Sequence, residues 1–334
     1  MIWYKDSGND IIVSTRIRLA RNLAKTPFPA VISQADKDRV KTALIESVTK
    51  SNTVIASEFD LYNFETLTDK EKTAMLEEHL ISPQLAASKD SAVLVNKDKN
   101  MSIMLMEEDH IRLQVIMGGY KLDEAFDLAD KVDNVMEESV EYAFDEKFGY
   151  LTACPTNAGT GLRASVMMHL PALVMTGNIN RVLQSFSGIG IAVRGLYGEG
   201  TEAEGCLYQI SNSITLGLSE REILDKIKTV TDKIADMEKQ AREVLVKNHN
   251  DELCDKLMRS YGILKYAVKV TSKEAKSMLS DCLLAQNMGI IDKNGNMSPL
   301  ELMIKTAPAI ISKDDELSPA ERDKKRAVLI RENI

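Results

Sequence analysis

The chain has 334 residues, of which 44% are hydrophobic and 28% are charged, values ordinary for a globular protein with one large or two medium domains. The formal net charge of −8 disfavours a general nucleic-acid-binding protein. No apolar run approaches the roughly 20 residues of a membrane helix. These two features predict no direct contact with nucleic acid or membrane. The four cysteines form no CxxC pair, so we expect reduced thiols and a cytoplasmic location.

Strand-like segments dominate the first two thirds of the chain. "DIIVSTRIRLARN" alternates so that Arg16 and Arg18 share one face of a strand. "SAVLVN" and "MSIMLM", joined by "KDKN", predict a hairpin. "EDHIRLQVIM" alternates again and is expected to place Glu108, His110 and Arg112 on one strand face. "GIGIAVRG" and "GCLYQISN" predict two more strands, and such spacing favours a largely antiparallel sheet.

Helical segments accompany these strands. Thr68 and Glu71 have capping-box spacing at the start of "TDKEKTAMLEEHL", and residues 122–144 have helical periodicity throughout. Ser219 and Glu222 predict the start of a long helix. Its apolar stripe is interpreted as a core or sheet-packing surface rather than a coiled coil. The stripe comprises Ile223, Ile227, Val230, Ile234, Met237, Ala241 and Val244.

The final third reads as mostly helical. Thr271 with Glu274, and Ser318 with Glu321, are further N-cap signatures. The sequence therefore predicts an α+β fold in two domains. Residues 1–249 are expected to form a domain with a largely antiparallel sheet flanked by helices, and residues 250–334 a smaller, mostly α-helical domain.

Arginines recur on the predicted strands and beside glycine-rich turns. A guanidinium binds two phosphate oxygens at once and keeps its charge, so this group is typical of a clamp for a polyphosphate. The sequence has neither a GxxxxGK[ST] loop nor a GxGxxG turn after a strand, which excludes the common P-loop and Rossmann sites. The arginines are Arg16, Arg18, Arg112, Arg163 and Arg194.

The stretch "CPTNAGTGLRAS", residues 154–165, places a cysteine at the head of a glycine-rich turn that ends in a cation. We expect this turn to lead into a helix beginning near Gly161, whose N-terminus, with the arginines, would favour a thiolate at Cys154. A buried inert cysteine is the alternative. No histidine is an evident partner for a nucleophilic cysteine.

Five motifs in this order carry a family resemblance: "STRIR", "EEHLISP", "EEDHIR", "CPTNAGTGLRAS" and "RGLYGEGTEAEGCLYQISN". Over residues 11–247 the chain resembles the phosphagen (guanidino) kinases, and within that family it is most similar to the bacterial protein-arginine kinases. The resemblance implies a phosphagen-kinase-like catalytic domain. Ala158 and Tyr197 depart from the leucine and arginine more common in the family, and Tyr197 implies a different pocket wall.

The same resemblance implies roles for individual positions, with ATP and Mg²⁺ as cofactors and no side chain assigned as a metal ligand. Glu108 and Glu199 would hold the substrate guanidinium, with Cys154 beside it. Glu108 is the favoured proton acceptor because we expect it on a rigid strand, although the choice between the two glutamates stays open. The implied nucleotide-binding positions are Ser14, Thr15, Arg16, Ile17, Arg18, His79, Arg112, Arg163, Ala164, Ser165, Val166, Met167, Arg194, Gly195, Leu196, Tyr197 and Gly198.

Near the C-terminus, "RDKKRA" is similar to a motif that forms an allosteric phosphoarginine pocket in protein-arginine kinases. The residues concerned are Arg322, Asp323, Arg326 and Ala327. We expect Arg322 and Arg326 on one helix face, with the arginines on the phosphate and Asp323 on the guanidinium. Taken alone, the pattern also fits an ordinary solvated helix.

The resemblance implies an ATP-dependent kinase of arginine residues in proteins, acting in a stress response and marking clients for degradation. The sequence does not include the helical N-terminal domain of the small-substrate kinases, which predicts a guanidinium site open to protein surfaces. Implied partners are a Clp-type unfoldase, a zinc-binding activator protein and a heat-shock repressor, and a homodimer is compatible with the sequence. A small-molecule guanidino kinase and a non-catalytic phosphoarginine-binding adaptor are the alternatives.

Overall fold

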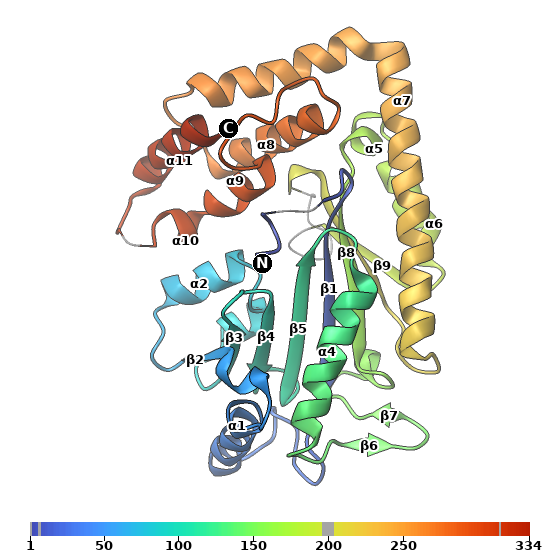
Figure 1. Cartoon of the computed structure of the whole chain (residues 1–334), viewed down its shortest axis with the longest axis vertical. Helices are drawn as coiled ribbons and strands as arrows, with labels where there is room; N and C mark the ends of the chain where they lie inside the picture. The colour runs from blue at the N-terminus through green and yellow to red at the C-terminus, as the bar shows by residue number, and fades with distance from the viewer. Residues whose placement is uncertain (1, 6–7, 196–203, 314) are drawn as a thin grey trace. The chain divides into compact units, whose positions relative to one another are not determined.

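The computed structural model describes residues 2–5, 8–195, 204–313 and 315–334 (Figure 1). The chain divides into two compact units, each assembled from separate segments. The first unit comprises Met1–Trp3, Thr15–Ser165 and Ser211–Lys228. The second comprises Tyr4–Ser14, Val166–Ile210 and Thr229–Ile334.

The first unit contains β2 to β5, most of β1 and the first half of β8, in the strand order β2-β3-β4-β5-β1-β8, and β2 to β5 pair antiparallel. The predicted hairpin is confirmed, because Leu94 of β3 pairs with Ile103 of β4 in antiparallel register. The strands are β1 (Ile12–Arg21), β2 (Phe59–Asn63), β3 (Ala92–Asn96), β4 (Met101–Leu105), β5 (Ile111–Gly118), β8 (Leu162–His169) and β10 (Leu207–Asn212). A separate two-stranded sheet pairs β6 (Phe144–Asp145) with β7 (Gly149–Tyr150).

Helices of the first unit cover this sheet. Helix α4 (Leu122–Glu137) contacts β5 and buries Ala125, Ala129, Val132 and Met136 (Figure 1). The helical pattern of residues 122–144 predicted a longer helix, but α4 ends at Glu137 and Phe144 already belongs to β6. The others are α1 (Gln34–Thr49), the 3₁₀ turn η1 (Val54–Ser57), α2 (Asp69–Glu77), α3 (Pro83–Ala86) and the 3₁₀ turn η2 (Pro155–Asn157).

The second unit contains the strand order β1-β8-β10-β9 and most of the helices after residue 170. Thr271 with Glu274 and Ser318 with Glu321 form the predicted capping boxes of α8 and α11. The elements are α5 (Pro171–Met175), α6 (Ile179–Ser187), β9 (Ile191–Gly195), η3 (Glu204–Cys206), α8 (Ser272–Asn287), α9 (Pro299–Lys305), α10 (Pro308–Ile311) and α11 (Pro319–Asn333).

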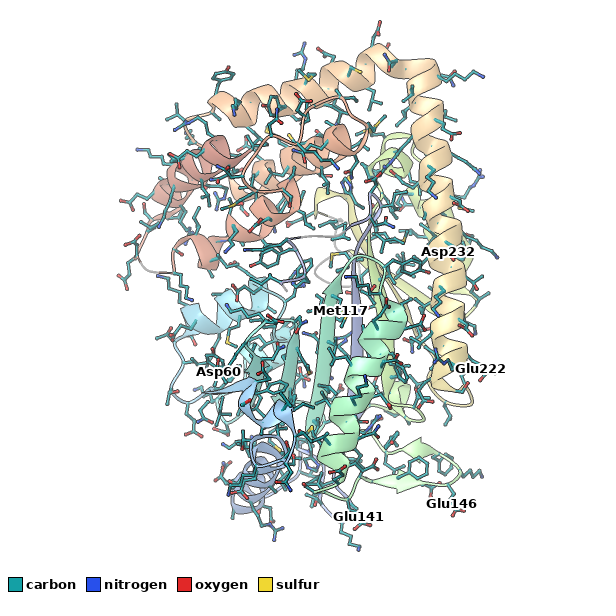
Figure 2. All side chains as sticks on the ribbon, viewed as in Figure 1. Asp60, Met117, Glu141, Glu146, Glu222 and Asp232 are labelled. Carbon is teal, nitrogen blue, oxygen red and sulfur yellow. The ribbon has the colours of Figure 1, made fainter. Side chains whose placement is uncertain are left out.

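The long helix α7 (Glu220–Tyr266) begins at the predicted Ser219–Glu222 cap, and Glu222 lies in its first turn (Figure 2). The helix bends at His249, whose backbone leaves the helical conformation. The apolar stripe is buried through Ile234, whereas Met237 and Val244 are exposed. These two side chains line a groove of about 750 Å³ between α5–α6 and α7, so the predicted packing surface is only partly covered. None of the described helices is both long and apolar enough to cross a membrane.

Candidate active site

Four arginines lie on three neighbouring strands of the first unit. Arg16 and Arg18 are on β1, between Arg112 on β5 and Arg163 on β8. Each arginine is partly exposed within a mostly buried strand. The structure thus brings together four of the five cations predicted to hold a polyphosphate.

The electrostatics of this cluster favour an anion. Burial, then the charges of Arg163 and Arg112, lowers the pKa of Arg16 to about 10. Burial, then the charges of its three arginine neighbours, also lowers the pKa of Arg18, an effect that Glu107 partly offsets. Its Nε atom is buried without a hydrogen-bond partner among the described residues. Like charges held this closely are stabilised when a phosphate group enters between them.

Two adjacent carboxylates pair with Arg112 but differ in exposure. Glu107 Oε2 lies 2.5 Å from Nη1, and Glu108 Oε2 accepts from Nη2 at 2.9 Å. The Glu107 side chain is 0% exposed and also accepts from the Ser82 hydroxyl, whereas the Glu108 side chain is 33% exposed. Glu107 is therefore held in place, and Glu108 is the carboxylate that can turn to an incoming ligand.

The strand predicted around Glu108 begins later than expected. β5 starts at Ile111, and Glu108 lies in the turn that joins β4 to β5. The expectation that Glu108 sits on a strand is wrong, because the alternation of "EDHIR" continues through a turn. Main-chain hydrogen bonds from Met106 to His110 and from Glu107 to Asp109 nevertheless fix the turn.

Cys154 heads a 3₁₀ turn rather than a segment leading to a helix. Residues 155–157 form η2, and the chain then enters β8 at Leu162. The prediction of a helix beginning near Gly161 is therefore wrong, because the residues after Gly161 form strand β8. The Cys154 sulfur lies 3.0 Å from Thr156 Oγ1.

Two glycines of the cysteine motif are required by close backbone contacts. Gly159 has φ +106°, and a Cβ there would lie 2.5 Å from the Thr215 carbonyl oxygen. Gly161 has φ +63°, and a Cβ there would lie 2.6 Å from the Ala20 carbonyl oxygen. Any larger residue would both strain the backbone and collide with a neighbouring segment.

Sequence reasoning missed a buried polar network behind these residues. Asn22, which follows β1, donates to Asp109 Oδ1 at 2.7 Å and accepts from the His110 backbone N–H at 2.9 Å. His110 Nδ1 accepts from the Leu23 backbone N–H, so its Nε2 carries the proton donated to the Pro27 carbonyl. Burial lowers the pKa of His110. The signal was the polar run "EEDH" between two apolar strands.

The remaining predicted nucleotide positions fall into three groups. His79, with φ +62°, accepts through its carbonyl from Gln114 of β5, two residues beyond Arg112. The second group is buried in β1 and β8: Ser14, Thr15, Ile17, Ala164, Ser165, Val166 and Met167. In the third group, Leu196, Tyr197, Gly198 and Glu199 lie outside the described residues, and only the backbones of Arg194 and Gly195 are described, in β9.

Comparison with known proteins identifies the family. Residues 39–241 match the ATP:guanido phosphotransferase C-terminal catalytic domain, and residues 250–334 match the protein-arginine kinase McsB C-terminal domain. The protein-arginine kinase of Brevibacillus brevis is 45% identical over 340 residues, covering 99% of this chain and 94% of that protein. The protein-arginine kinase of Caldanaerobacter subterraneus is also 45% identical, covering 95% of each. The chain belongs to the protein-arginine kinases of the ATP:guanido phosphotransferase family.

Solved structures agree on the fold of this kinase. Lombricine kinase aligns with a TM-score of 0.62 at 24% identity, covering 73% of this chain and 70% of that one. The duplicated taurocyamine kinase from Schistosoma mansoni, with bound transition state analog components, aligns with a TM-score of 0.62 at 25% identity. That alignment covers 69% of this chain and 33% of the other. The α+β expectation is confirmed, and membership of the family makes ATP the phosphoryl donor.

The C-terminal motif of the kinase differs from the expected pair of exposed arginines. Arg326 is only 1% exposed, while Arg322 and Asp323 are partly exposed and Ala327 is buried. The Arg326 guanidinium donates to the Thr306 carbonyl at 3.0 Å, to the Val270 carbonyl at 2.9 Å and to Asp323 Oδ1 at 2.6 Å. Arg326 therefore joins the segments before α8 and after α9, and only Arg322 and Asp323 are accessible.

Proposed function

We propose that this kinase transfers the γ-phosphoryl group of Mg-ATP to the guanidinium of arginine residues in proteins. The observation that carries the proposal is a cluster of four partly exposed arginines, one of which, Arg112, pairs with the accessible carboxylate of Glu108. This combination supplies positive charge for a triphosphate and a negative group for a guanidinium within one unit. The names of the most similar relatives support arginine in proteins as the acceptor.

The arginine cluster would bind and align the triphosphate. Phosphoryl transfer depends on charge neutralisation and on in-line positioning more than on covalent chemistry. Arg16, Arg18 and Arg163 extend from two neighbouring strands of one sheet, so they would meet the developing charge with little rearrangement. On binding, Arg112 would exchange its contact with Glu108 for phosphate oxygens and so release the carboxylate. Arg194 is proposed as the fifth cation.

Glu108 would orient the acceptor and remove its proton. In this step a guanidinium nitrogen forms a bond to the γ-phosphorus, the bond from that phosphorus to the bridging oxygen breaks, and ADP leaves. The proton released from the nitrogen passes to Glu108. Glu199 would hold the opposite side of the guanidinium, with Cys154 beside it. A positioned carboxylate base contributes about 10²–10⁴-fold to such a reaction.

Magnesium is proposed to arrive with the nucleotide. The described residues contain no group of three or more His, Cys, Asp or Glu side chains suited to hold a metal ion. Mg²⁺ commonly binds to substrate phosphates and water with few protein carboxylates. This chemistry fits a site lined by arginines, in which the ion is part of the Mg-ATP substrate.

Residues 250–334 are proposed as a domain that binds phosphoarginine and regulates residues 1–249. Arg322 would bind the phosphate and Asp323 the guanidinium, while Arg326 holds Asp323 in position. We also propose that the modification marks clients for a Clp-type unfoldase during stress. A zinc-binding activator protein, a heat-shock repressor and a second copy of this chain are proposed partners.

The direct test is incubation with Mg-ATP and a protein mixture, followed by mass spectrometry for acid-labile phosphate on arginine. Glu108→Gln should lower kcat by about 10²–10⁴-fold, because the amide cannot accept the proton. Glu141→Gln is the matched control, since Glu141 is an exposed carboxylate of the same unit (Figure 2). Parental activity in Glu108→Gln would contradict its role.

A small-molecule guanidino kinase is the second candidate. Its acceptor would be free arginine, and the described residues of the site do not distinguish the two by charge. A single assay with free arginine and a protein such as casein separates them. Phosphorylation of free arginine as efficient as that of the protein would overturn the proposed substrate class.

A further inference from the structure

Asp109 is a buried carboxylate at the junction of three segments of the first unit. It is 0% exposed and directly follows Glu108 in the turn between β4 and β5. Its Oδ1 atom accepts from Asn22 Nδ2 at 2.7 Å and from the Ala153 backbone N–H at 2.7 Å. One oxygen atom therefore links the Glu108 turn, the end of β1 and the residue just before Cys154.

The Cys154 segment is anchored on both sides of the cysteine. On the N-terminal side, Asp109 holds the Ala153 N–H, and Asn22 donates to the Leu151 carbonyl at 3.0 Å. On the C-terminal side, the Thr215 hydroxyl lies 2.9 Å from the Thr156 carbonyl oxygen and 2.6 Å from that of Ala158. Ala153 and Cys154 are themselves only partly buried. Their position thus depends on these few contacts rather than on packing within a core.

Core structure alone is a poor explanation for the carboxylate. Oδ2 of Asp109 is buried and has no hydrogen-bond partner among the described residues. Burying a carboxyl group with one oxygen unsatisfied is unfavourable, and each such group in a native protein calls for an explanation. A charge-assisted bond from a backbone N–H to a carboxylate is shorter and stronger than a neutral one, so it fixes a loop more firmly.

We propose that Asp109 is a positioning residue that fixes the main chain before Cys154 relative to the turn that carries Glu108. Asp109 is fully buried, so it would act on the substrate through the segments that it holds rather than by direct contact. This inference rests on the proposed roles of Glu108 and Cys154 at the guanidinium. It assigns Asp109 to the alignment of the acceptor and not to the binding of ATP.

The test compares Asp109→Ala with Asp109→Asn in the full chain. The alanine variant loses the acceptor for the Ala153 N–H, whereas the asparagine variant keeps an oxygen at Oδ1. We expect Asp109→Ala to lower kcat for a protein substrate by about ten- to a hundredfold, because small misplacements of reacting groups have effects of this size. The KM for Mg-ATP should stay within about twofold, since the arginine cluster is intact. Asp109→Asn should retain most of the activity.

A second readout follows the thiol itself. The alkylation rate of Cys154 by iodoacetamide, measured on its own peptide by mass spectrometry across a pH series, should change by about threefold or more in Asp109→Ala and little in Asp109→Asn. Ala153→Pro removes the N–H donor from a partly exposed residue and leaves the buried Asp109–Asn22 pair in place. Ala153→Pro should change the alkylation profile as Asp109→Ala does. It replaces Asp109→Ala in the test if the alanine variant folds poorly.

Glu238→Gln is the control for a general loss of stability, and it should leave the alkylation profile of Cys154 as in the parent. Glu238 is a buried carboxylate of the second unit that also accepts backbone N–H groups, those of Ala172 and Leu173. If Cys154 reactivity is parental in Asp109→Ala and Ala153→Pro, or if Asp109→Asn loses as much as Asp109→Ala, the proposal is overturned. A parental chain without kinase activity would refute the proposed function, while the alkylation series would still judge Asp109.

Discussion

The cluster of four arginines on the sheet and the single arginine Arg326 differ in exposure and in the partners of their guanidinium groups. Arg16, Arg18, Arg112 and Arg163 crowd together on three strands, and the carboxylates paired with them are Glu107 and Glu108. Arg326 instead has two carbonyl oxygens and Asp323 as acceptors. In the first group, burial and like-charge repulsion from neighbouring arginines lower the pKa of Arg16 and Arg18, so the group is suited to bind an anion. The second is complete and suited to hold segments together.

From this contrast we propose a binding role for the cluster and a structural role for Arg326. A cation removed from water destabilises the fold unless acceptors surround it. The arginines of the cluster therefore repel one another, and a bound triphosphate would relieve this repulsion, whereas the guanidinium of Arg326 already has acceptors within the protein. Stability and binding should respond in opposite ways to mutations in the two groups.

The largest expected effect is on stability, at Arg326. Arg326→Ala removes the hydrogen-bond donor to Asp323 and to the carbonyl groups of Thr306 and Val270. It should therefore lower the free energy of unfolding by about 3–5 kcal/mol. Urea denaturation measures it. Arg322→Ala, at a partly exposed site four residues earlier, should stay within about 0.5 kcal/mol. Equal stability of Arg326→Ala and the parent would show that Arg326 is free for a ligand.

The next effect is on ATP binding, at Arg18. Arg18→Gln removes one charged donor to phosphate, worth about 1.5–3 kcal/mol, so the Kd for Mg-ATP should rise by about ten- to a hundredfold. The Tm should not fall, because a destabilised cation is removed. Arg39→Gln, at an exposed arginine of α1, is the control for loss of charge. A large loss of Tm in Arg18→Gln without loss of ATP affinity would reverse the comparison.

The smallest expected effect is on the pH dependence of stability, at the buried histidine His169, which stays neutral in the folded protein. Burial, then the charge of Arg242, lowers the pKa of His169 to about 3, and its Nε2 lies 2.8 Å from Ser280 Oγ. Below about pH 6.5 the unfolded chain binds a proton that the folded chain does not, so stability falls as pH decreases. The loss should be about 1.4 kcal/mol at pH 5.5.

Substitution of His169 tests whether this residue causes the loss of stability as pH decreases. His169→Gln should remove this part of the pH dependence between pH 6.5 and 5.5, as followed by denaturation at several pH values. His249→Gln, at an exposed position on α7, should leave the slope as it is in the parent. An unchanged slope in His169→Gln would mean that His169 is protonated in the folded protein.

Local patterns were sufficient where the structure depends on neighbouring residues. The alternation around Arg16 and Arg18, the hairpin at residues 92–105 and the capping boxes are all present. Local patterns were insufficient where distant segments decide. "LRASVMMH" contains good helix formers but forms β8, because it pairs between β1 and β10.

The acceptors of Arg326 show the same limit. Val270 and Thr306 lie 56 and 20 positions away, so a helix pattern gives no sign that this arginine is buried. Glu108 is a milder case, since the alternation of its strand extends into the preceding turn. The family motifs pointed to Glu108, and only tertiary contacts distinguish its partly exposed side chain from the buried Glu107.

The two glycines of the cysteine motif limit which substitutions this segment can accept during evolution. A Cβ at Gly159 or Gly161 would collide with Thr215 or Ala20, whereas Cys154 is partly exposed to solvent. A saturation library across residues 154–165, sorted first for folded protein, should therefore tolerate replacement of the thiol and reject nearly all changes at the two glycines. The thiol would become indispensable only in a later sort for turnover.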